Sequence, residues 1–515
     1  MKEKKYILIN QFIESLDEAE LLSEIKDLSN NRDLNNEVSH ITFNSKDVVN
    51  GTLFVCKGIN FKKDYLIEAL ENGSIVYIMD EKLAAMYSNE TKKYGAIGII
   101  VKDIRKTMPV IVRTFYGDLP SEIDIVGITG TKGKSTTAYF VRGILDDYLK
   151  SQGKKSSAIC SGIENYDGIS IEESHNTTPE IMEIYYYMDN AVSNDIDYMT
   201  MEVSSQALKV GRVEGIKFKV ATFLNIGEDH VSPIEHPDYE DYFNSKLKIF
   251  DNADIACVNM DSDRIKRIMK RAGKCSEIIS FSKNNKNANV YCKSMINVEG
   301  SPIINVCVNY KDMKIEDEVH LAVFGSINLE NALAAISICV ALNIPFEYIK
   351  SGLSKVKVPG RMEIFRSSSG DKIAVVDYAH NKMSFDTFYS NIKKDLPKRD
   401  VITVFGSTGG KALDRREGMG ISAGKNSIYS IVTSDDPGEE DAFQICLEIG
   451  KYIEQSGGKY EIIVNREEAV KKAVSMLDDK NLLFLAGKGR ENMQKIGKKK
   501  IKIKSDVELV EELIG

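Results

Sequence analysis

The stretch Val126–Thr137, with the sequence VGITGTKGKSTT, contains the residue types from which proteins build a phosphate-binding loop. A short apolar run, Ile123–Val126, leads into it, and a helical pattern follows it. Gly130 and Gly133 allow main-chain N–H groups to turn toward an anion, and the N-terminus of the following helix attracts negative charge. A strand, a glycine-rich loop and a helix in this order predict a site for the phosphates of ATP.

The residues after the second glycine supply the charge and the hydroxyl groups that such a site needs. Lys134 would place a positive charge at the outer phosphates, and Ser135 or Thr136 would offer a hydroxyl to Mg²⁺. The spacing departs from the GxxxxGK[ST] pattern, since Ile128 stands five residues before Gly133. The alternative is an ordinary glycine-rich turn capped by a serine, but strand, loop, Lys-Ser pair and helix all agree on phosphate binding. The predicted ATP-binding loop residues are Gly130, Thr131, Lys132, Gly133, Lys134, Ser135 and Thr136.

Two further segments could supply metal ligands. Glu202 follows the apolar run YMTM, and the pair Asp229-His230 follows the run VATFLNIG. A carboxylate and an imidazole at strand ends near a phosphate loop are suitable ligands for Mg²⁺, although histidine is a less usual ligand than oxygen. The alternatives are a solvated acid for Glu202 and a surface histidine for His230. Lys246 lies in an apolar helical stretch, where its aliphatic stem would lie along the surface with the ammonium in water.

Composition limits the class of protein. A chain of 515 residues is too long for one core, and its formal net charge of −8 argues against binding a nucleic acid. Its eight cysteines are scattered without metal-ligand spacing, so we expect reduced thiols in the core. We identify neither a signal peptide nor a membrane span, and we therefore expect a cytoplasmic protein.

The order of the expected elements indicates an α/β protein with three domains. They are an N-terminal domain (1–110), a central ATP-binding domain (111–359) with a P-loop-type parallel sheet, and a Rossmann-like C-terminal domain (360–515). The stretch Thr114–Ser121 has the glycine and proline of a linker. Strands that alternate with helices imply parallel sheets. The expected strands of the central domain after the loop are Tyr198–Met201, Val220–Asn225 and Ile255–Asn259.

The C-terminal part repeats one local pattern, in which an apolar strand runs into a polar cluster. The ligands of open α/β sheets bind at the carboxyl ends of the strands, so we expect the clusters to face one cleft. The strands are Ile373–Val376, Val401–Phe405, Ile428–Val432 and Leu482–Leu485, and the clusters are Asp377–His380, Gly406–Gly410, Ser434–Gly438 and Gly487–Glu491.

Several motifs together resemble the Mur ligase family, the ATP-dependent enzymes that build the peptide stem of bacterial cell-wall precursors. They are TGTKGKST, NTTPE, EVSSQALKVGRV, the Asp-His pair, GRMEIF followed by VVDYAH, and AGKGRE. The loop TGTKGKST is similar to the ATP loop of the family, which departs from the standard P-loop in the same way. The likeness extends from Asn44-Ser45 to Glu491, and the motifs resemble most the members that add the third amino acid of the stem.

The resemblance implies a role for each matching residue. Lys134, His230 and Lys246 would be catalytic, with Lys246 as a carbamylated lysine whose carbamate oxygens bind a second Mg²⁺. The implied metal ligands are Ser135, Glu202, His230 and Lys246. The implied contacts of the UDP-MurNAc-dipeptide are Ser45, Thr177, Thr178, Ser204 and Arg212. Asn331 would contact adenine, and Arg361 and Asp377 would contact the nucleotide. Arg416 and Glu491 would hold the α-carboxylate and the amine ends of the amino acid, beside Asp435, Asp436, Pro437 and Gly438.

The implied reaction is an amide ligation through an acyl phosphate. The γ-carboxylate of D-Glu in UDP-MurNAc-L-Ala-D-Glu attacks the γ-phosphate of ATP, and the amine of a free amino acid then displaces phosphate. The implied partners are thus the UDP-MurNAc-dipeptide and an amino acid, with no nucleic acid and no membrane, and we expect a monomer. A related amide ligase on another substrate, such as a folylpolyglutamate synthetase, and a non-catalytic nucleotide-binding regulator are the alternatives.

The identity of the amino acid rests on one turn. Family members that add meso-diaminopimelate generally carry Asp-Asn-Pro-Arg, and the arginine pairs with the distal carboxylate. Here the turn is Asp435–Gly438, and Gly438 cannot form that pair. The acids Asp435, Asp436, Glu439 and Glu440 favour a cationic side chain, so we predict L-lysine, with L-ornithine or meso-diaminopimelate as alternatives. The acids could instead form only a solvated turn.

Overall fold

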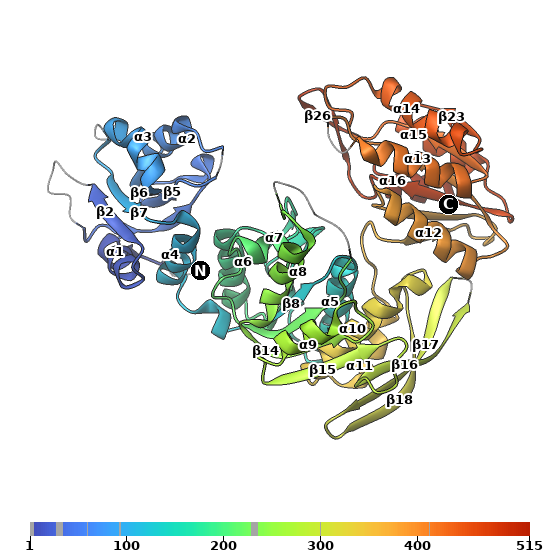
Figure 1. Cartoon of the computed structure of the whole chain (residues 1–515), viewed down its shortest axis with the longest axis horizontal. Helices are drawn as coiled ribbons and strands as arrows, with labels where there is room; N and C mark the ends of the chain where they lie inside the picture. Colours follow the sequence, from blue (N-terminus) through green and yellow to red (C-terminus); the bar gives the residue numbers. More distant parts are fainter. Residues whose placement is uncertain are drawn as a thin grey trace. The chain divides into compact units, whose positions relative to one another are not determined.

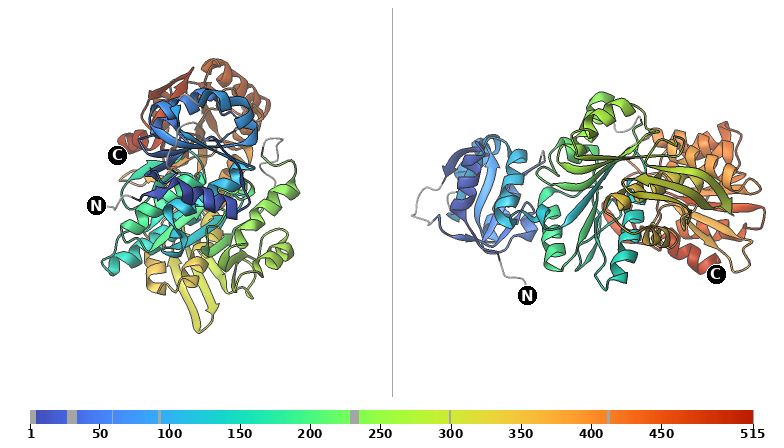
Figure 2. Two further views of the ribbon diagram at one scale, coloured as in Figure 1. Left: turned by 90° about the vertical axis from the view of Figure 1, so that its left-hand side faces the viewer. Right: turned by 90° about the horizontal axis from the view of Figure 1, so that it is seen from below.

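The structure is a computed structural model, and it describes residues 5–26, 34–58, 60–91, 94–227, 235–298, 300–410 and 413–514, without the side chains of 88–90. The chain divides into two compact units. Figure 1 labels helices and strands, and Figure 2 shows the ribbon from two further directions. The first contains Met1–Lys134, Tyr148–Ser280 and Ala341–Asn343, and the second contains Ser135–Asp147, Phe281–Val340 and Ile344–Gly515. Asp229 and His230 lie outside the described residues.

The N-terminal part of the first unit is a five-stranded sheet in the order β2-β7-β6-β5-β4, in which β4 to β7 are parallel and β2 is antiparallel. Alternate residues of each strand face opposite helix layers: Leu53 and Ile78 pack with one cluster, and Phe54 and Tyr77 with the other. The elements are β1 (Ile7–Leu8), α1 (Ile9–Glu18), β2 (Leu22–Lys26), β3 (Glu37–Val38), β4 (His40–Thr42), η1 (Ser45–Asp47), β5 (Thr52–Val55), α2 (Lys63–Glu71), β6 (Ser74–Asp80), α3 (Glu81–Thr91), β7 (Ile97–Val101) and α4 (Ile104–Tyr116).

Helix α4 corrects the expected linker. Asp103 caps its N-terminus by accepting hydrogen bonds from the N–H groups of Arg105 and Lys106. The helix buries one apolar face and continues to Tyr116, and a 3-10 turn (η3, Leu119–Ser121) follows closely. The prediction of a linker at Thr114–Ser121 is therefore wrong. The apolar face of α4 favours a helix that continues up to Gly117, where the helix ends.

The rest of the first unit surrounds a sheet in the order β11-β10-β9-β12-β8-β13-β14-β15. Strands β9, β12, β8, β13 and β14 are parallel, as expected, and the expected strands begin and end within two residues of the observed ones. The elements are β8 (Asp124–Thr129), α5 (Lys134–Ser151), β9 (Ala158–Cys160), β10 (Glu164–Tyr166), β11 (Ile171–Glu173), α6 (Ile181–Ser193), β12 (Tyr198–Glu202), α7 (Ser205–Lys209), β13 (Phe218–Phe223), α8 (Tyr239–Leu247), η4 (Lys248–Phe250), β14 (Ala253–Asn259), α9 (Ile265–Ala272) and β15 (Glu277–Ser282). Of these, Ser135–Asp147 of α5 and the end of β15 from Phe281 belong to the second unit.

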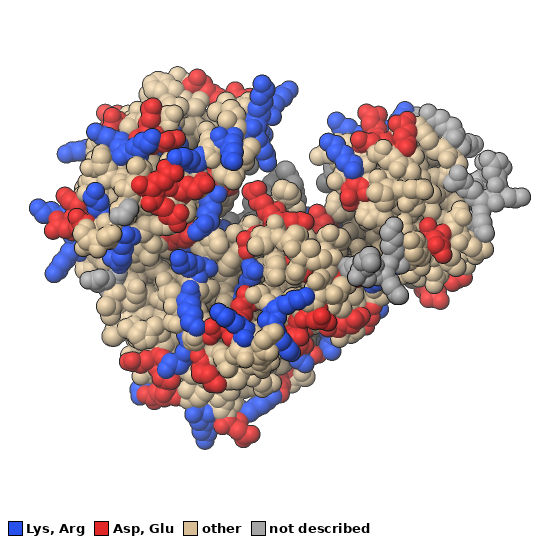
Figure 3. Space-filling model, turned by 180° about the vertical axis from the view of Figure 1, so that it is seen from behind, with Lys and Arg blue, Asp and Glu red and all other residues tan. Residues whose placement is uncertain are grey.

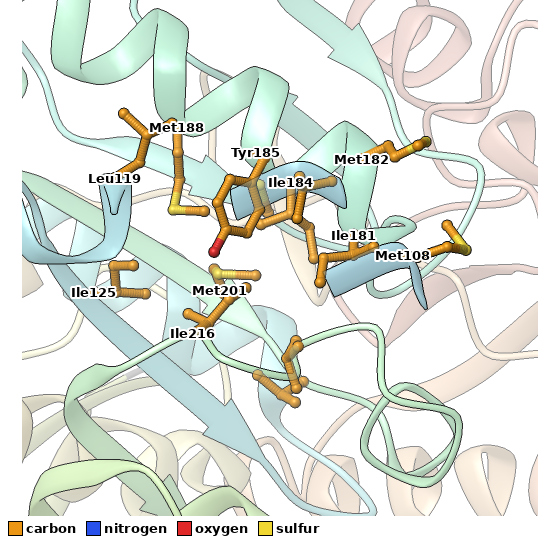
Figure 4. Packing of buried hydrophobic residues seen from close by; sticks show 14 of the residues in the cluster. Met108, Leu119, Ile125, Ile181, Met182, Ile184, Tyr185, Met188, Met201 and Ile216 are labelled. Atoms are coloured by element: carbon orange, nitrogen blue, oxygen red, sulfur yellow. The ribbon is translucent and has the colours of Figure 1, made fainter. Parts of the chain in front are cut away.

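Helix α6 covers this sheet through a continuous apolar contact. Tyr185 and Met188 of α6 point toward Met201 of β12 and Ile125 of β8, with Leu119 beside them (Figure 4). These five side chains are at most 3% exposed. This burial fixes the position of α6 against β12 and β8. Glu202 lies at the carboxyl end of β12, and the glycine-rich loop follows the carboxyl end of β8.

The second unit contains an antiparallel β-meander and an open α/β sheet. The meander is β16 (Val290–Val298), β17 (Ser301–Tyr310) and β18 (Met313–His320), followed by η5 (Ser326–Asn328), α10 (Leu329–Ala341) and α11 (Phe346–Leu353). The open sheet has the order β19-β20-β24-β21-β22-β23, and all its strands except β19 are parallel. Its elements are β19 (Glu363–Arg366), β20 (Ile373–Asp377), α12 (Lys382–Asp395), β21 (Asp400–Phe405), α13 (Asp414–Asn426), β22 (Tyr429–Val432), α14 (Ala442–Gln455), β23 (Tyr460–Ile462), α15 (Arg466–Ser475), β24 (Asn481–Ala486), β25 (Met493–Ile496), β26 (Lys499–Lys502) and α16 (Asp506–Ile514).

The open sheet confirms the expected Rossmann-like arrangement. Val375 and Phe484 face a core shared with α12, α13 and α14, whereas Val376 and Leu485 face a second core shared with α15 and α16. Helices therefore cover both faces, which is why the strands are apolar throughout.

Two general properties bear on the expected class of protein. All eight cysteines are free thiols and all but Cys292 are buried, which confirms the prediction of core thiols. Within the described segments, no helix combines the length and the apolar character that crossing a bilayer requires. On the face shown in Figure 3, basic and acidic side chains lie interspersed.

Candidate active site

The glycine-rich loop follows the carboxyl end of β8 and leads into α5. Gly133 has φ of 87° and caps α5, a conformation that glycine adopts without strain. A Cβ atom at Gly130 would lie 2.8 Å from the Cβ of Leu224. Both glycines are thus required by the geometry, as the sequence predicted, and the loop presents the N-terminus of a long helix.

The end of β13 fixes the loop in place. The Thr131 N–H donates to the main-chain oxygen of Asn225 (3.1 Å), and the Lys132 N–H donates to its side-chain oxygen (2.9 Å). Asn225 Nδ2 in turn donates to the carbonyl of Lys132 (3.1 Å), and the hydroxyls of Thr131 and Tyr242 are 3.0 Å apart. The sequence assigned no role to Asn225 or Tyr242, and only the position of Asn225 at the end of a predicted strand could have indicated one.

Two lysine side chains converge on the carbonyl oxygen of Gly130. The Nζ atoms of Lys134 and Lys246 both lie 2.9 Å from it, so the two ammonium groups are at most about 5.8 Å apart. Their mutual repulsion at that separation is about 3 kcal/mol at an effective dielectric constant of ~20. An anion at this point relieves the repulsion, and a phosphate group or a carbamate on Lys246 has the required charge.

Lys246 is buried. It is 1% exposed, and its Nζ lies 4.7 Å from the ring centroid of Tyr242. Both the stem and the ammonium are therefore inside the protein, which excludes the alternative of a surface lysine whose ammonium reaches water. Helix α8 places Lys246 beside the loop because the apolar side chains around it are anchored in the core.

Glu202 is also buried and lies beside the loop. It is 1% exposed, it is the last residue of β12, and it is paired in register with Ile128 of β8. Its Oε1 accepts the N–H of Gly162 at 2.8 Å, so the interpretation as a solvated acid is wrong. Ser135 follows in the first turn of α5. A carboxylate oxygen is a donor that Mg²⁺ prefers, so Glu202 fits this ion. Among the described residues no preassembled group of three His, Cys, Asp or Glu side chains could hold a metal.

Most of the residues expected to contact the peptide substrate meet at the end of β12. The Thr178 hydroxyl donates to the carbonyl of Glu202 (2.9 Å) and accepts the N–H of Ser204 (2.9 Å). Arg212 donates from Nη1 to the carbonyl of Thr178 (3.1 Å). A Cβ atom at Gly162 would lie 3.7 Å from both Thr177 and Glu202, so Thr177 borders the same place. Ser45 lies in the N-terminal sheet region instead, where its hydroxyl donates to Glu68 at 2.5 Å.

A buried hydrogen-bonded chain connects α7 with α8. His236 is 0% exposed, its Nδ1 lies 2.6 Å from Asp241 Oδ2, and its Nε2 lies 3.0 Å from the hydroxyl of Ser205. Lys209 contacts the same Asp241 oxygen at 2.6 Å. Ser204, which precedes α7, and Lys246, near the end of α8, are thereby held on two cross-linked helices. The sequence suggested no partner for His236.

The four polar clusters of the second unit lie together, as predicted. The Gly487 N–H donates to the carbonyl of Asp377 (3.1 Å), and the Gly409 N–H donates to that of Asp436 (2.9 Å). The carboxyl ends of adjacent parallel strands produce this arrangement.

Lys488 changes the interpretation of the acidic turn. It is 1% exposed, and its Nζ lies 2.9 Å from Asp436, 2.7 Å from Glu491 and 3.9 Å from Asp435. Burial raises the pKa of Asp435, and the attraction of neighbouring cations opposes this shift. Glu440 pairs with another residue of the chain, Arg416. The negative charge concentrated at this turn is therefore partly neutralised, because three of the four acids have cationic partners in the chain itself. A merely solvated turn is wrong as well, since Asp435 is buried.

Arg416 is engaged by two glutamates. It is 4% exposed, and its guanidinium lies 2.8 Å from Glu440 and 2.7 Å from Glu448. Its buried Nε makes no hydrogen bond. A carboxylate ligand would have to use this donor or displace a glutamate.

The residues expected at the nucleotide are also placed by local contacts. Arg361 lies with its guanidinium 5.0 Å from the ring centroid of Tyr378. Asp377 accepts the N–H of Met362 at 2.8 Å, and Asn331 donates to Asn328 at 3.1 Å.

Two family models and several curated relatives match this chain. Residues 128–339 match the Mur ligase middle domain, and residues 360–489 match the domain described as Mur ligase, glutamate ligase domain. A UDP-N-acetylmuramyl-tripeptide synthetase of Ligilactobacillus salivarius is 34% identical, with 97% of each chain covered. A UDP-N-acetylmuramoyl-L-alanyl-D-glutamate–L-lysine ligase of Enterococcus faecalis is 34% identical, covering 89% of this chain and 88% of the relative.

A solved structure shares the fold. A UDP-N-acetylmuramoyl-L-alanyl-D-glutamate–2,6-diaminopimelate ligase superposes with a TM-score of 0.63 at 22% identity, over 95% of this chain and 97% of that one. The domain matches and the identity over nearly the full length lead to one conclusion. The chain belongs to the Mur ligase family.

Proposed function

We propose that the chain is an ATP-dependent ligase that joins L-lysine to the D-Glu γ-carboxylate of UDP-MurNAc-L-Ala-D-Glu, a step of peptidoglycan precursor synthesis. The observation that carries the proposal is the convergence of Lys134 and the buried Lys246 on the Gly130 carbonyl, beside the buried Glu202. These groups, the glycine-rich loop and the N-terminus of α5 have the charge and placement that phosphoryl transfer requires. The printed names of the relatives from Ligilactobacillus salivarius and Enterococcus faecalis support the same reaction.

The residues divide the work between charge neutralisation and orientation. We assign the triphosphate to the loop and to Lys134, and the magnesium site to Ser135, Glu202, His230 and a carbamylated Lys246. Mg²⁺, when bound, neutralises charge on the phosphoryl group. Thr178, Ser204 and Arg212 would orient the carboxylate that attacks the γ-phosphate. The acyl phosphate that results would then react with the amine of the amino acid, which we place beside Asp435 and Glu491.

The choice of L-lysine rests on the relatives and on one missing side chain. The relative from Enterococcus faecalis carries L-lysine in its name. Gly438 cannot provide an arginine for a second carboxylate, and loss of such a pair costs on the order of 2–4 kcal/mol of binding. L-lysine and L-ornithine carry the same side-chain charge, so charge alone does not separate them. Lys488 also neutralises part of the acidic turn.

Three further properties belong to the same proposal. We retain the domains 1–110, 111–359 and 360–515, of which the last two contain the two matched family domains. We also propose that the enzyme is a cytoplasmic monomer, with UDP-MurNAc-dipeptide, ATP and the amino acid as its ligands. Size-exclusion chromatography with light scattering would test the monomer, and a mass of twice the chain would contradict it.

The test is a product assay with separate amino acids. The protein, Mg²⁺, ATP and UDP-MurNAc-L-Ala-D-Glu are incubated with L-lysine, L-ornithine or meso-diaminopimelate, and products are identified by mass. We expect the lysine adduct and stoichiometric ADP. Lys134→Met should lose product formation, whereas Lys150→Met, an exposed change on the same helix, should retain it. Nucleotide binding without any adduct would favour a regulator, and an adduct with diaminopimelate alone would refute L-lysine.

A further inference from the structure

The carboxylate of Glu180 forms ion pairs with three cationic side chains. Lys57 Nζ and Arg105 Nη1 each lie 3.0 Å from Glu180 Oε2, and Arg212 Nε lies 3.0 Å from Oε1. The side chains of Lys57, Glu180 and Arg212 are only 10%, 10% and 13% exposed, whereas that of Arg105 is 39% exposed. We name these four residues the Glu180 cluster. No role for Lys57, Arg105 or Glu180 followed from the sequence.

The cluster lies at the edge of the N-terminal sheet where ligands of open α/β sheets bind. Lys57 follows the carboxyl end of β5, and Arg105 lies in the first turn of α4, after the carboxyl end of β7. Ser45 follows the carboxyl end of β4, at the same edge. Parallel strands bring the loops at their carboxyl ends to one edge, so Lys57, Arg105 and Ser45 lie along the same edge of this sheet. Arg212 connects that place to the peptide-contact residues through the carbonyl of Thr178.

The main chain of Glu180 is held at the N-terminus of α6, where the Glu183 side chain accepts the Glu180 N–H at 2.7 Å. From this fixed position the Glu180 carboxylate contacts all three cations.

The cluster has more positive than negative charge. Three cations face Glu180 and Glu183, which leaves an excess of one positive charge when both acids are ionised. Burial alone would raise the pKa of Glu180, but the attraction of Lys57, Arg212 and Arg105 outweighs it and lowers the pKa. Burial lowers the pKa of Lys57 more than the attraction of Glu180 raises it. Lys57 is thus a desolvated cation with incomplete compensation, and a further anion would stabilise it.

Hydrogen-bond donors remain for that anion. A guanidinium has five N–H donors, of which Arg212 uses one on Thr178 and Arg105 uses one on Glu180. Arg105 is 39% exposed and lines a cavity of about 1150 Å³, so solutes can reach this member of the cluster. Lys57, Glu180 and Arg212 are not among the residues that line this cavity.

We infer that Lys57 and Arg105, together with Arg212, bind an anionic group of the UDP-sugar peptide, a phosphate or a carboxylate, and that Glu180 is the positioning residue for all three. The inference rests on the proposed function and adds two specificity-determining cations to it. The anion would come either from the diphosphate of UDP or from the carboxylates of D-Glu.

The test measures binding by calorimetry without ATP. Lys57→Met and Arg105→Met should each weaken UDP-MurNAc-L-Ala-D-Glu about tenfold, the usual effect of losing one charge-assisted contact. Lys106→Met is the matched control, because Lys106 neighbours Arg105 and lines the same cavity but does not contact Glu180. Lys57→Arg should recover binding, and Glu180→Gln should weaken it although it removes no cation. KM for ATP and for the amino acid should stay unchanged, which a general structural defect would not allow.

Two fragments identify the source of the anion. A weaker affinity of the variants for UDP assigns the diphosphate, and a weaker affinity for MurNAc-L-Ala-D-Glu assigns the carboxylates. Variants that bind the whole substrate as the wild type does, or that raise all three KM values alike, overturn the inference alone. A wild-type protein that does not bind this substrate overturns the proposed function itself.

Discussion

Gly409 offers the sharpest test of the proposed amino-acid site. It lies in the cluster after β21, and its N–H donates to the carbonyl of Asp436 at 2.9 Å. A Cβ atom at this position would lie 1.9 Å from the carbonyl oxygen of Pro437 and 2.7 Å from its carbonyl carbon. Contacts below 3.0 Å essentially never occur for a real Cβ, and the obstacle here is backbone. Gly409→Ala must therefore displace the turn at Asp436 and Pro437 by roughly 1 Å.

A displacement of that size has a large functional effect only if the turn binds a substrate. A misplacement of about 1 Å at a binding site can reduce the rate about 100-fold. We expect Gly409→Ala to raise KM for L-lysine by one to two orders of magnitude. KM for ATP and for the UDP-sugar peptide should change little, because the loop after β8 is not altered.

Gly410→Ala is the matched control in the adjacent position. Gly410 has φ of 72°, and a Cβ atom there would meet nothing within 4 Å. This change costs about 1–2 kcal/mol of local strain without any collision. Steady-state kinetics with each substrate varied in turn provides the measurement. A Gly409→Ala enzyme with the wild-type KM for L-lysine, or a Gly410→Ala enzyme that is equally impaired, would refute the assignment of this turn.

Further predictions concern the buried charges and the thiols. Lys246→Ala should lose ligase activity and Lys246→Arg should not restore it, because arginine cannot carry a carbamate; an active alanine variant in the product assay would remove Lys246 from the site. Arg466 and Asp506 pair through 2.7 Å contacts and are almost fully buried. Asp506→Asn should therefore lower the free energy of unfolding of its unit by about 3–5 kcal/mol. The double change Arg466→Met with Asp506→Leu should leave that free energy nearly unchanged. Hydrogen exchange in α15 and α16 measures the stability of the single and the double variant. Equal protection in the single variant and the wild type would contradict the expectation. The folded pKa of Glu180 lies below its ordinary value of 4.5, so ionised Glu180 stabilises the fold above that pH and the benefit is lost as the pH falls through the folded pKa. The melting temperature of the wild type should thus fall more steeply below about pH 4.5 than that of Glu180→Gln; parallel curves would count against this. Maleimide should label Cys292 first, since it alone among the cysteines is not buried, and peptide mass mapping would reveal any other order.

The sequence pattern predicted the strands, the glycine-rich loop and the joint position of the C-terminal clusters, because each depends on residues close together in the chain or on the rule for parallel strands. The apolar strands after Glu122 and after Pro359 were found almost at their predicted limits, because strands covered on both faces are recognisable from their residues alone. The loop at Gly130 and Gly133 was predicted because its glycines are needed for backbone conformation and close packing. The joint position of the four C-terminal clusters followed from the rule for parallel strands.

Contacts between distant residues could not be predicted in the same way. The Nζ of Lys246 meets the carbonyl of Gly130, 116 residues away, and Lys488 meets Asp436, 52 residues away. A lysine in an apolar helix looks the same in sequence whether its ammonium reaches water or a buried carbonyl. The same limit explains why the cationic partners of the acidic turn and the triple contact of Glu180 were not foreseen.

The two hydrogen-bond contacts of His236, with Ser205 and with Asp241, limit which substitutions related sequences can accept. A fully enclosed imidazole that needs an acceptor on one nitrogen and a hydroxyl on the other restricts both neighbours at once. Replacing either neighbour by an apolar residue would leave a buried ring nitrogen without a hydrogen-bond partner. We therefore expect natural variants to change all three residues together. An alignment of relatives can be read for such joint replacement without any enzyme in hand.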